Sequence, residues 1–525
     1  MADHVRAWQE GQRLHINDLP DEMIQAITKY LPIGDRKNLS MVSSLWNGHA
    51  FSDANMDYVR LRIKGSAHEH RHRPSLYRSE RRYRHLVYSS RNPLNEIDFD
   101  MTMYTLMVLG SEIQSFVLLN RCTLGQLKEL VDLLPNLQML SLNVVSVGNS
   151  LVEFPAMQQL RELRMNNNTL LEAWLTSSLA NSNIRKLYVN LTGRREGEDQ
   201  FLNFIAQHQK QLEWFGLLAP EHLKISYNKL NLRQLHTLDL SEAQCERDEE
   251  ELITFFKNLP ILQVAMLHFD VTTAVLKVIC NHCACLYKLR FKVDALGSEC
   301  FRFLRRLIHL RDLIIDGEIR HDMIEACPPL NGVKFLSLTK NPLSFGATMG
   351  QLTRLFPRLR ILKVDLTQEL EMSNQFISGI GQHFSQITCL FIESEVSCND
   401  LTTSTMTHFV EPLIFSHLRR LTNLQELTLS CVRFVARYCP PSKDNCLFVN
   451  FQKMCNGDWN EQPRENLRRL KLKNCHWVTG NTLKYVLTVF TSIQYLEVSK
   501  CRMITPEDID EFRTVLPKCI VYYVR

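Results

Sequence analysis

The stretch Leu310-Arg-Asp-Leu313-Ile-Ile315 is one copy of a hexad, apolar-x-x-apolar-x-apolar, that recurs along most of the 525-residue chain. Other clear copies are Leu137-Gln-Met-Leu140-Ser-Leu142, Leu235-His-Thr-Leu238-Asp-Leu240 and Leu467-Arg-Arg-Leu470-Lys-Leu472. Fifteen units begin at positions 113, 137, 160, 184, 212, 235, 262, 286, 310, 333, 359, 387, 424, 467 and 493. Most spacings between units lie between 23 and 28 residues, and two near the C-terminal end widen to 37 and 43. A repeat therefore organises most of the chain.

Each repeat unit is typical of a strand, a turn and a helix. The Leu-x-Leu alternation predicts a short strand with one buried face. The following segment changes to helical spacing, as in Leu124, Leu127 and Val131. Units of this length and pattern resemble leucine-rich repeats, in which neighbouring units stack because one unit alone cannot bury its apolar face. We therefore expect an α/β leucine-rich-repeat solenoid, a horseshoe with parallel strands on the concave face and helices on the convex face.

The repeat sets the expected domain boundaries. We expect the solenoid to span residues 83–525, with a leading strand at 83–88 and a closing strand at 519–524. The two wide spacings predict insertions near 394–416 and 431–465. The ninth position of a unit requires a small side chain, and it is filled by Asn168, Asn341, Cys475 and Cys501. These two cysteines lie in matching phrases and resemble the cysteine-containing subfamily of these repeats.

Composition and charge narrow the class of protein. The net charge is +5, but residues 60–91 hold ten basic and two acidic residues, so the remainder is slightly acidic. A chain coated by nucleic acid is therefore not expected. No apolar run approaches the length that spans a bilayer, and the first residues lack the apolar stretch of a secretory signal. The 16 cysteines are expected to be reduced thiols, and the protein to be cytoplasmic, nuclear or both.

Residues 16–60 do not share the repeat and predict a small helical module, after a lead at 1–15 and before a basic linker at 61–82. Ile24, Ile27 and Leu31 are expected on one face of a first helix that Pro32 ends. Asp35 is expected to cap a second helix with Leu39, Val42 and Trp46 on one face. A module of this length cannot bury enough apolar surface to be stable alone. We therefore expect a partner to cover part of the apolar faces of these two helices.

The stretch Ile16-Asn-Asp-Leu19-Pro20-Asp-Glu-Met-Ile24-Gln-Ala-Ile27-Thr-Lys-Tyr30-Leu31-Pro32 resembles the opening of an F-box. The family's closing Val-Cys-basic-x-Trp corresponds to Val42-Ser-Ser-Leu-Trp46, which keeps Val and Trp but lacks the Cys and the basic residue. The resemblance to F-box/leucine-rich-repeat proteins implies a non-catalytic substrate receptor of an SCF (Skp–cullin–F-box) ubiquitin ligase. It implies that a Skp-type adaptor, itself bound to a cullin scaffold, contacts Leu19, Pro20, Ile24, Ile27, Leu31 and Val42. The alternative for these residues alone is a helical cap of the solenoid.

The third, fifth and seventh positions of a hexad are expected on the concave face, where a protein substrate would bind. The candidate substrate-binding residues are Tyr188, Trp214, Lys288, Arg290, Lys292, Asp312, Asp316, Arg469, Lys471 and Lys473. The lysine and arginine side chains among them form one basic row on each strand, which we call a cationic rung, and these rungs favour an acidic or phosphorylated substrate. A solvated face with scattered apolar side chains is the alternative.

Other constellations do not predict catalysis or metal binding. Cys280-Asn-His282-Cys283-Ala-Cys285 contains one Cys-x-x-Cys step, but no second such step follows, so we expect structural thiols and no metal. The irregularly spaced Cys431, Cys439, Cys446 and Cys455 leave a zinc site open. No phosphate-binding glycine loop or nucleophile elbow is present, and no residue indicates a cofactor.

Two further functional hypotheses stay open. One is a repeat scaffold that assembles partners without promoting their degradation. The other is nucleic-acid binding through residues 60–91, which would be steeply dependent on salt.

Overall fold

The computed structural model describes residues 16–57, 59–64, 81–90, 94–144, 154–166, 179–190, 198–218, 226–241, 248–293, 296–325, 327–339, 345–366, 374–394, 418, 420–430, 466–475, 478, 480, 483, 486 and 490–524. The chain divides into two compact units, Met1–Gln234 and Leu235–Arg525. The expected insertions at 394–416 and 431–465, with the four cysteines of the latter, fall outside the described residues except for Ser394. So do Asn168 and Asn341.

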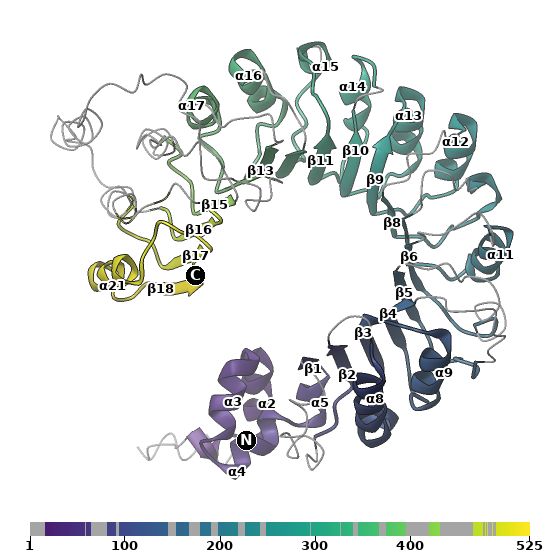
Figure 1. Cartoon of the computed structure of the whole chain (residues 1–525). Helices are drawn as coiled ribbons and strands as arrows, with labels where there is room; N and C mark the ends of the chain where they lie inside the picture. Colours follow the sequence, from purple (N-terminus) through teal and green to yellow (C-terminus); the bar gives the residue numbers. More distant parts are fainter. Residues whose placement is uncertain are drawn as a thin grey trace, which may run out of the picture. The chain divides into compact units, whose positions relative to one another are not determined.

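The first unit begins with a helical module and continues into a parallel sheet (Figure 1). The module consists of η1 (Ile16–Asp18), α2 (Asp21–Tyr30), α3 (Ile33–Ser40), α4 (Ser44–Ala50) and α5 (Asp53–Met56). The strands are β1 (Arg60–Lys64), β2 (His85–Ser89), β3 (Ser115–Cys122), β4 (Met139–Val144), β5 (Glu162–Asn166), β6 (Lys186–Asn190) and β7 (Trp214–Leu218). Between or after them lie α8 (Glu96–Leu109), η2 (Gly110–Glu112), α9 (Leu124–Asp132), α11 (Glu198–His208) and η3 (Tyr227–Lys229). Each strand pairs in parallel with the next.

The sheet begins earlier than the sequence pattern predicted. Strand β1 occupies Arg60–Lys64, where a basic linker was expected from residue 61, and it pairs with β2. This strand lacks the leading leucine of a hexad, which is why the pattern missed it. Its Leu61 and Ile63 still alternate with basic residues, and Ile63 is buried. The predicted leading strand at 83–88 corresponds to β2 and is therefore the second strand.

The second unit continues the same repeat. Its strands are β8 (Thr237–Ser241), β9 (Val264–Asp270), β10 (Lys288–Lys292), β11 (Asp312–Asp316), β12 (Phe335–Thr339), β13 (Ile361–Leu366), β14 (Cys389–Ser394), β15 (Glu426–Ser430), β16 (Arg469–Lys473), β17 (Tyr495–Ser499) and β18 (Ile520–Val524). Its helices are α12 (Glu249–Lys257), α13 (Thr273–His282), α14 (Cys300–Leu304), α15 (His321–Glu325), α16 (Phe345–Leu355), α17 (Asn374–His383) and α21 (Pro506–Val515). Consecutive strands are again parallel, and the helices lie on one side of the sheet (Figure 1).

The hexad leucines form the core because strand register stacks them. Leu289 pairs with Leu313, Leu313 with Leu336, and Leu336 with Leu362, and all are buried. The outward residues Arg290 and Ile314 are only partly buried, whereas Ser337 on β12 is buried. Successive side chains of a strand point to opposite faces, so each strand presents one face to the core and one to the inner surface. The expected leucine-rich-repeat solenoid is thereby confirmed.

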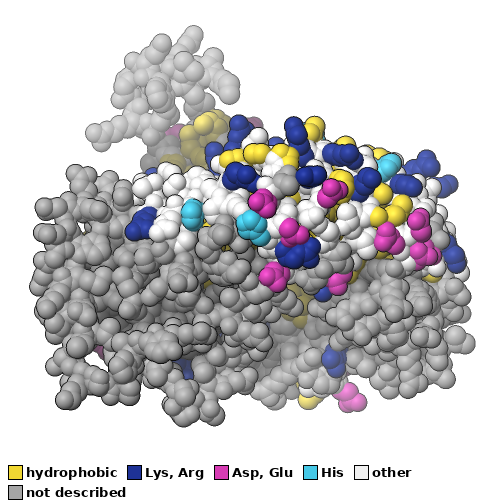
Figure 2. Space-filling view, turned by 90° about the horizontal axis from the view of Figure 1, so that it is seen from above, with side chains coloured by type: hydrophobic (Ala, Val, Ile, Leu, Met, Phe, Trp, Pro, Cys, Tyr) yellow, Lys and Arg dark blue, Asp and Glu magenta, His cyan; other side chains and the backbone are white. Residues whose placement is uncertain are grey.

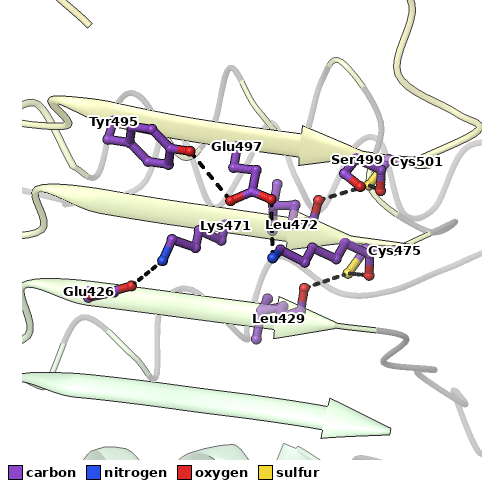
Figure 3. A network of polar contacts seen from close by, with 10 residues as sticks. Glu426, Leu429, Lys471, Leu472, Cys475, Tyr495, Glu497, Ser499 and Cys501 are labelled. Atoms are coloured by element: carbon purple, nitrogen blue, oxygen red, sulfur yellow. Dashed lines mark hydrogen bonds and ion pairs between the residues drawn. The ribbon is translucent and has the colours of Figure 1, made fainter. Parts of the chain in front are cut away.

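The predicted turn chemistry is also present at the end of the strands. The eighth position takes the left-handed conformation in three units, with φ of 96° at Gly317, 52° at Asn474 and 55° at Lys500. The ninth position in two of these units is a buried cysteine that donates to a main-chain carbonyl of the preceding strand (Figure 3). The Sγ–O distances are 3.3 Å from Cys475 to Leu429 and 3.5 Å from Cys501 to Leu472. Helix α21 begins with a capping box formed by Thr505 and Asp508.

Candidate functional site

The helical module carries a concentration of exposed apolar side chains, which we call the N-terminal apolar surface. Its members are Ile16, Met23, Ile27, Tyr30, Ile33, Met41, Val42 and Leu45. Tyr30 is 86% exposed, Met41 78% and Val42 68%. A module this small leaves much of its apolar surface in water, and a cluster of this kind marks a site of protein association.

The structure distributes the six predicted adaptor contacts differently from the sequence prediction. Ile27 and Val42 are exposed, and Leu19, Pro20 and Leu31 are half-buried. Ile24 is fully buried, because it faces the module's own core together with Thr28, one helical turn later. The module buries the Ile24 side chain, so the adaptor contact expected of it stays a prediction, and in the structure Ile24 packs in the module's core.

Sequence periodicity also missed Met41, because it joined two helices into one. The structure has a break after Ser40, and Ser43 caps a new helix by accepting a hydrogen bond of 3.3 Å from the Trp46 backbone nitrogen. Val42 consequently lies in the turn and is exposed, whereas Trp46 is buried. The expected cap at Asp35 is wrong, since α3 starts at Ile33 after Pro32. The Ser-Ser pair before Trp46 was the available signal for a capped start.

A buried arginine holds the module together. The Arg36 guanidinium donates to the main-chain oxygens of Lys29 at 2.8 Å, Leu31 at 2.9 Å and Asn55 at 3.0 Å. The Asn55 side-chain nitrogen in turn donates to Thr28 Oγ1 at 2.9 Å. These bonds join the C-terminal end of α2 to α3 and α5, and so they fix the backbone under the N-terminal apolar surface.

Basic residues join the module to the sheet of the same unit. Arg81 lies over the Phe51 ring, with 3.6 Å from Cζ to the ring centroid. Arg82 and Arg84 pair with Asp53 and Asp57. In addition, His85 Nε2 lies 2.8 Å from the Asp57 main-chain oxygen at the start of β2. The charge at the end of the predicted linker therefore lies along a junction.

The inner face of the first unit holds an aromatic and cationic cluster on three adjacent strands. Tyr188 and Trp214 have ring centroids 5.8 Å apart, and the Arg164 Cζ lies 5.8 Å from the Trp214 ring. Gly216 makes room for the pair, because a Cβ there would lie 2.5 Å from Tyr188 Cδ2. The two aromatic residues were predicted for this face, and they are half-buried there. Sequence reasoning missed Arg164, which occupies the fifth position of its hexad.

The predicted basic rungs of the second unit are partly neutralised by carboxylates. Arg290 Nε lies 2.8 Å from Asp316 Oδ2, and the Asp316 side chain is buried. Within the part of the chain that the structure describes, Lys288 and Lys292 form no ion pair. Burial raises the pKa of Asp312, an effect that Lys288 opposes. Two of these cations thus remain able to meet an acidic group.

The rungs on β16 are paired in the same way (Figure 3). Lys471 Nζ lies 2.6 Å from Glu426 Oε1 on β15, and Lys473 Nζ lies 3.1 Å from Glu497 Oε1 on β17. Arg469 is exposed at the start of the strand. An incoming acidic group would have to compete with these carboxylates. They belong to other repeat units than the lysines, so the sequence pattern did not predict the ion pairs.

Partly buried polar groups around Arg290 have shifted pKa values. Burial, reinforced by Arg290, lowers the pKa of His268 to about 4, so this histidine is neutral at pH 7. Burial raises the pKa of Asp239, against the opposing effect of Arg290 and Lys288. His268 Nε2 lies 3.7 Å from Asp239 Oδ1, too far for a hydrogen bond. The inner face here is therefore a balanced mixture of charges.

The cysteine-rich stretch of the second unit has the surroundings of structural thiols. Cys280 and Cys283 are buried, whereas His282 and Cys285 are exposed. Burial raises the pKa of Cys283 to about 12, which keeps its thiol protonated. Over the described ranges of the chain, no group of three His, Cys, Asp or Glu side chains is placed to hold a metal ion. The same residues include no helix both long and apolar enough to cross a membrane.

The chain was compared with known protein families, curated proteins and solved structures. Residues 16–54 match the F-box domain family. No curated protein matches the chain. The solved structures similar to it include a leucine-rich-repeat protein of Leptospira interrogans, with 15% identity, a TM-score of 0.32 and coverage of 83% of this chain and 89% of that one. They also include the complex of Rad7 and Elc1 from yeast, with 12% identity, a TM-score of 0.35 and coverage of 99% and 95%. A TLR13–ssRNA13 complex has 16% identity, a TM-score of 0.32 and coverage of 79% and 60%.

The chain thus carries an F-box domain followed by a leucine-rich-repeat solenoid. The predicted resemblance to F-box/leucine-rich-repeat proteins is confirmed at this level.

Proposed function

We propose that this chain is the substrate-recognition subunit of an SCF ubiquitin ligase. Its F-box would dock on a Skp-type adaptor that is bound to a cullin, and the inner surface of its repeats would hold a protein substrate. The observation that carries the proposal is the F-box match at residues 16–54 together with the exposed N-terminal apolar surface. In such a complex the chain itself is non-catalytic, because ubiquitin transfer takes place on other subunits.

The adaptor contact would be centred on Met41 and Val42. Both are exposed in a turn that ends at the capped start of α4, and their backbone nitrogens donate to the main-chain oxygens of Asn38 and Leu39. Truncating both to alanine removes apolar surface that binding would bury, which should cost about 3 kcal/mol and roughly a hundredfold in affinity. Leu19 and Pro20, at the start of α2, would contribute the half-buried rim of the same contact.

The first test is binding of the purified chain to a purified Skp-type adaptor. We expect the wild-type chain to bind and the Met41→Ala/Val42→Ala variant to lose roughly a hundredfold in affinity. A matched control exists in the second unit, where Met503 and Val515 are exposed by 50% and 56%. The Met503→Ala/Val515→Ala variant should bind like the wild type. If the wild-type chain binds no adaptor, the receptor proposal fails and the non-degradative scaffold replaces it.

The substrate would be anchored on the aromatic and cationic cluster of the first unit. Trp214 and Tyr188 offer a large, rigid and only half-buried surface. Arg164 lies beside the Trp214 ring, and its charge is already paired with Glu162 at 2.7 Å, so a substrate carboxylate would have to compete for it. Trp, Tyr and Arg are the residue types that most often contribute a large share of the binding energy of a protein interface. Trp214→Ala should therefore weaken substrate capture while adaptor binding is unchanged.

Lys288 and Lys292 would supply the acidic or phosphate selectivity of the second unit. Their charges are not used in internal ion pairs with described residues, unlike the charge of Arg290. Lys288→Glu/Lys292→Glu should then abolish capture of an acidic or phosphorylated substrate. Retained capture would remove these two residues from the substrate site.

A further inference from the structure

The second unit carries a row of basic side chains at the edge of the sheet where strands β11, β12 and β13 begin. The three strands are parallel and in register, with Asp312 opposite Phe335 and Phe335 opposite Ile361. The residues just before them, Arg311, Lys334 and Arg360, therefore occupy equivalent positions on adjacent rungs. Neighbouring strands in a sheet lie ~4.8 Å apart, so the three cations span about 10 Å.

Backbone hydrogen bonds hold these three positions in line. The Lys334 nitrogen donates to the Arg311 oxygen at 2.8 Å, and the Arg360 nitrogen donates to the Lys334 oxygen at 2.9 Å. Gly332 lies between the rungs, and a Cβ there would come within 2.6 Å of the Leu310 main-chain oxygen. The glycine lets the rungs approach closely and leaves no side chain standing between them.

Three further cations enlarge the row. Arg305 and Arg306 follow α14, and Arg358 precedes β13 by three residues. All six side chains are exposed, and we call them the basic edge: Arg305, Arg306, Arg311, Lys334, Arg358 and Arg360. Figure 2 shows Lys and Arg side chains gathered along the upper rim of the coloured surface, with hydrophobic side chains among them and most Asp and Glu side chains below.

The protein offsets little of the charge of the basic edge, although the Asp312 carboxyl, whose pKa is raised by burial, lies close enough to Arg311 for that charge to oppose the rise. The connecting segments 305–311, 327–334 and 355–360 contain no Asp or Glu. None of the six cations forms an ion pair within 4.0 Å with a described residue, whereas Arg290, Lys471 and Lys473 on the inner face do. Like charges on adjacent rungs repel one another, so the arrangement is stabilised when an anionic partner binds.

An apolar side chain in the same row indicates the class of that partner. Ile308 is 76% exposed and lies between Arg306 and Arg311 in the sequence. An isoleucine in this position gains nothing from phosphate groups, but it can be buried by an apolar residue of a protein segment. The mixture of cations with a central apolar residue therefore favours an acidic peptide over nucleic acid.

We propose that the basic edge binds an extended acidic segment of a partner protein, with an apolar residue of that segment packed on Ile308. A row of about 10 Å matches three or four residues of extended chain, at ~3.3 Å per residue. The site shares no residue with the N-terminal apolar surface or with the inner-face residues assigned to the substrate. It therefore adds a second contact for a substrate or a regulator, and its test is independent of adaptor binding.

The experiment measures binding of a fluorescent twelve-residue peptide of Glu and Asp with one central Leu to the full chain. The peptide should bind more weakly as salt rises, and Arg311→Glu/Lys334→Glu/Arg360→Glu should weaken binding at least tenfold. Lys257→Glu/Arg502→Glu/Lys518→Glu reverses three exposed cations elsewhere in the same unit and should bind like the wild type. If the glutamate variant does not fold, the corresponding triple glutamine variant decides, with the same expected direction.

Two comparisons separate the proposal from its rivals. Ile308→Ser should weaken binding of the Leu-containing peptide and leave a peptide with Ser in place of Leu unaffected. An oligonucleotide duplex of equal charge should bind more weakly than the peptide. The proposal is overturned if the Arg311, Lys334 and Arg360 variants bind the peptide as the wild type does, or if the duplex binds more tightly.

Discussion

Replacement of Arg36 by methionine should unfold the F-box module while the repeats stay folded. Arg36 is 6% exposed and donates to three main-chain oxygens, of which the Asn55 oxygen is fully buried. Methionine keeps most of the side-chain volume but leaves that oxygen without a donor. The other two oxygens, on Lys29 and Leu31, are partly buried and can accept hydrogen bonds from water instead.

The magnitude follows from these three bonds. Loss of the buried, charge-assisted bond should cost about 2 kcal/mol, and the two partly buried bonds about 0.5 kcal/mol each. The total of about 3 kcal/mol is comparable with the entire stability expected of so small a module. In native-state hydrogen exchange, amides in α2 to α5 should lose protection roughly a hundredfold.

The assay compares amide exchange in residues 16–56 with exchange in strands β8 to β18 of the same full-length chain. We expect faster exchange in the module only, and a parallel loss of adaptor binding. Lys37→Met is the control, because Lys37 is an exposed cation in the same helix and should change neither. Unchanged exchange in α2 to α5 of the Arg36→Met variant would refute the role given to this arginine.

Three other outcomes are expected. His268 takes up its proton near pH 6.5 when unfolded and near pH 4 when folded, so its contribution to stability is complete above pH 6.5 and falls as pH drops to about 4. The wild type should therefore lose more unfolding free energy between pH 7 and pH 4.5 than the His268→Gln variant, by up to about 3 kcal/mol as measured by chemical unfolding. An equal loss in the two proteins would contradict the lowered pKa of His268. Lys500 has a φ of 55°, so Lys500→Gly should stabilise the chain by up to about 1 kcal/mol and Lys500→Val should destabilise it; a stabilising valine would be incompatible with this backbone. Gly216→Ala should displace Tyr188 from Trp214 and change the Trp214 fluorescence, which is isolated by subtracting the spectrum of a Trp214→Phe variant; an unchanged spectrum would refute the packing.

The repeat could be predicted because its information is periodic. Hexad leucines such as Leu313 recur at spacings that only a stacked strand explains, and their register in the structure follows from that spacing. Strand β1 was missed because its apolar pair, Leu61 and Ile63, is not preceded by the leading leucine of a hexad. Local pattern therefore identified the fold but not where the sheet starts.

The candidate surfaces were predicted less completely, because exposure depends on tertiary packing. Periodicity grouped Ile24 with Ile27, but the module packs Ile24 inward and leaves Met41 outside. The cationic rungs were identified by position, yet their charge balance depends on strands far apart in sequence, as with Lys471 and Glu426. Such pairs arise only when the repeats stack, so no single unit reveals them.

Affinity capture with proteasome activity blocked tests the proposed receptor most directly. The wild-type chain and the Met41→Ala/Val42→Ala variant would be compared for bound proteins and for the ubiquitin attached to them. We predict that both capture the same substrate through the repeats, and that the substrate is ubiquitinated with the wild type and unmodified with the variant. Equal ubiquitination of the captured proteins with both chains would contradict the account.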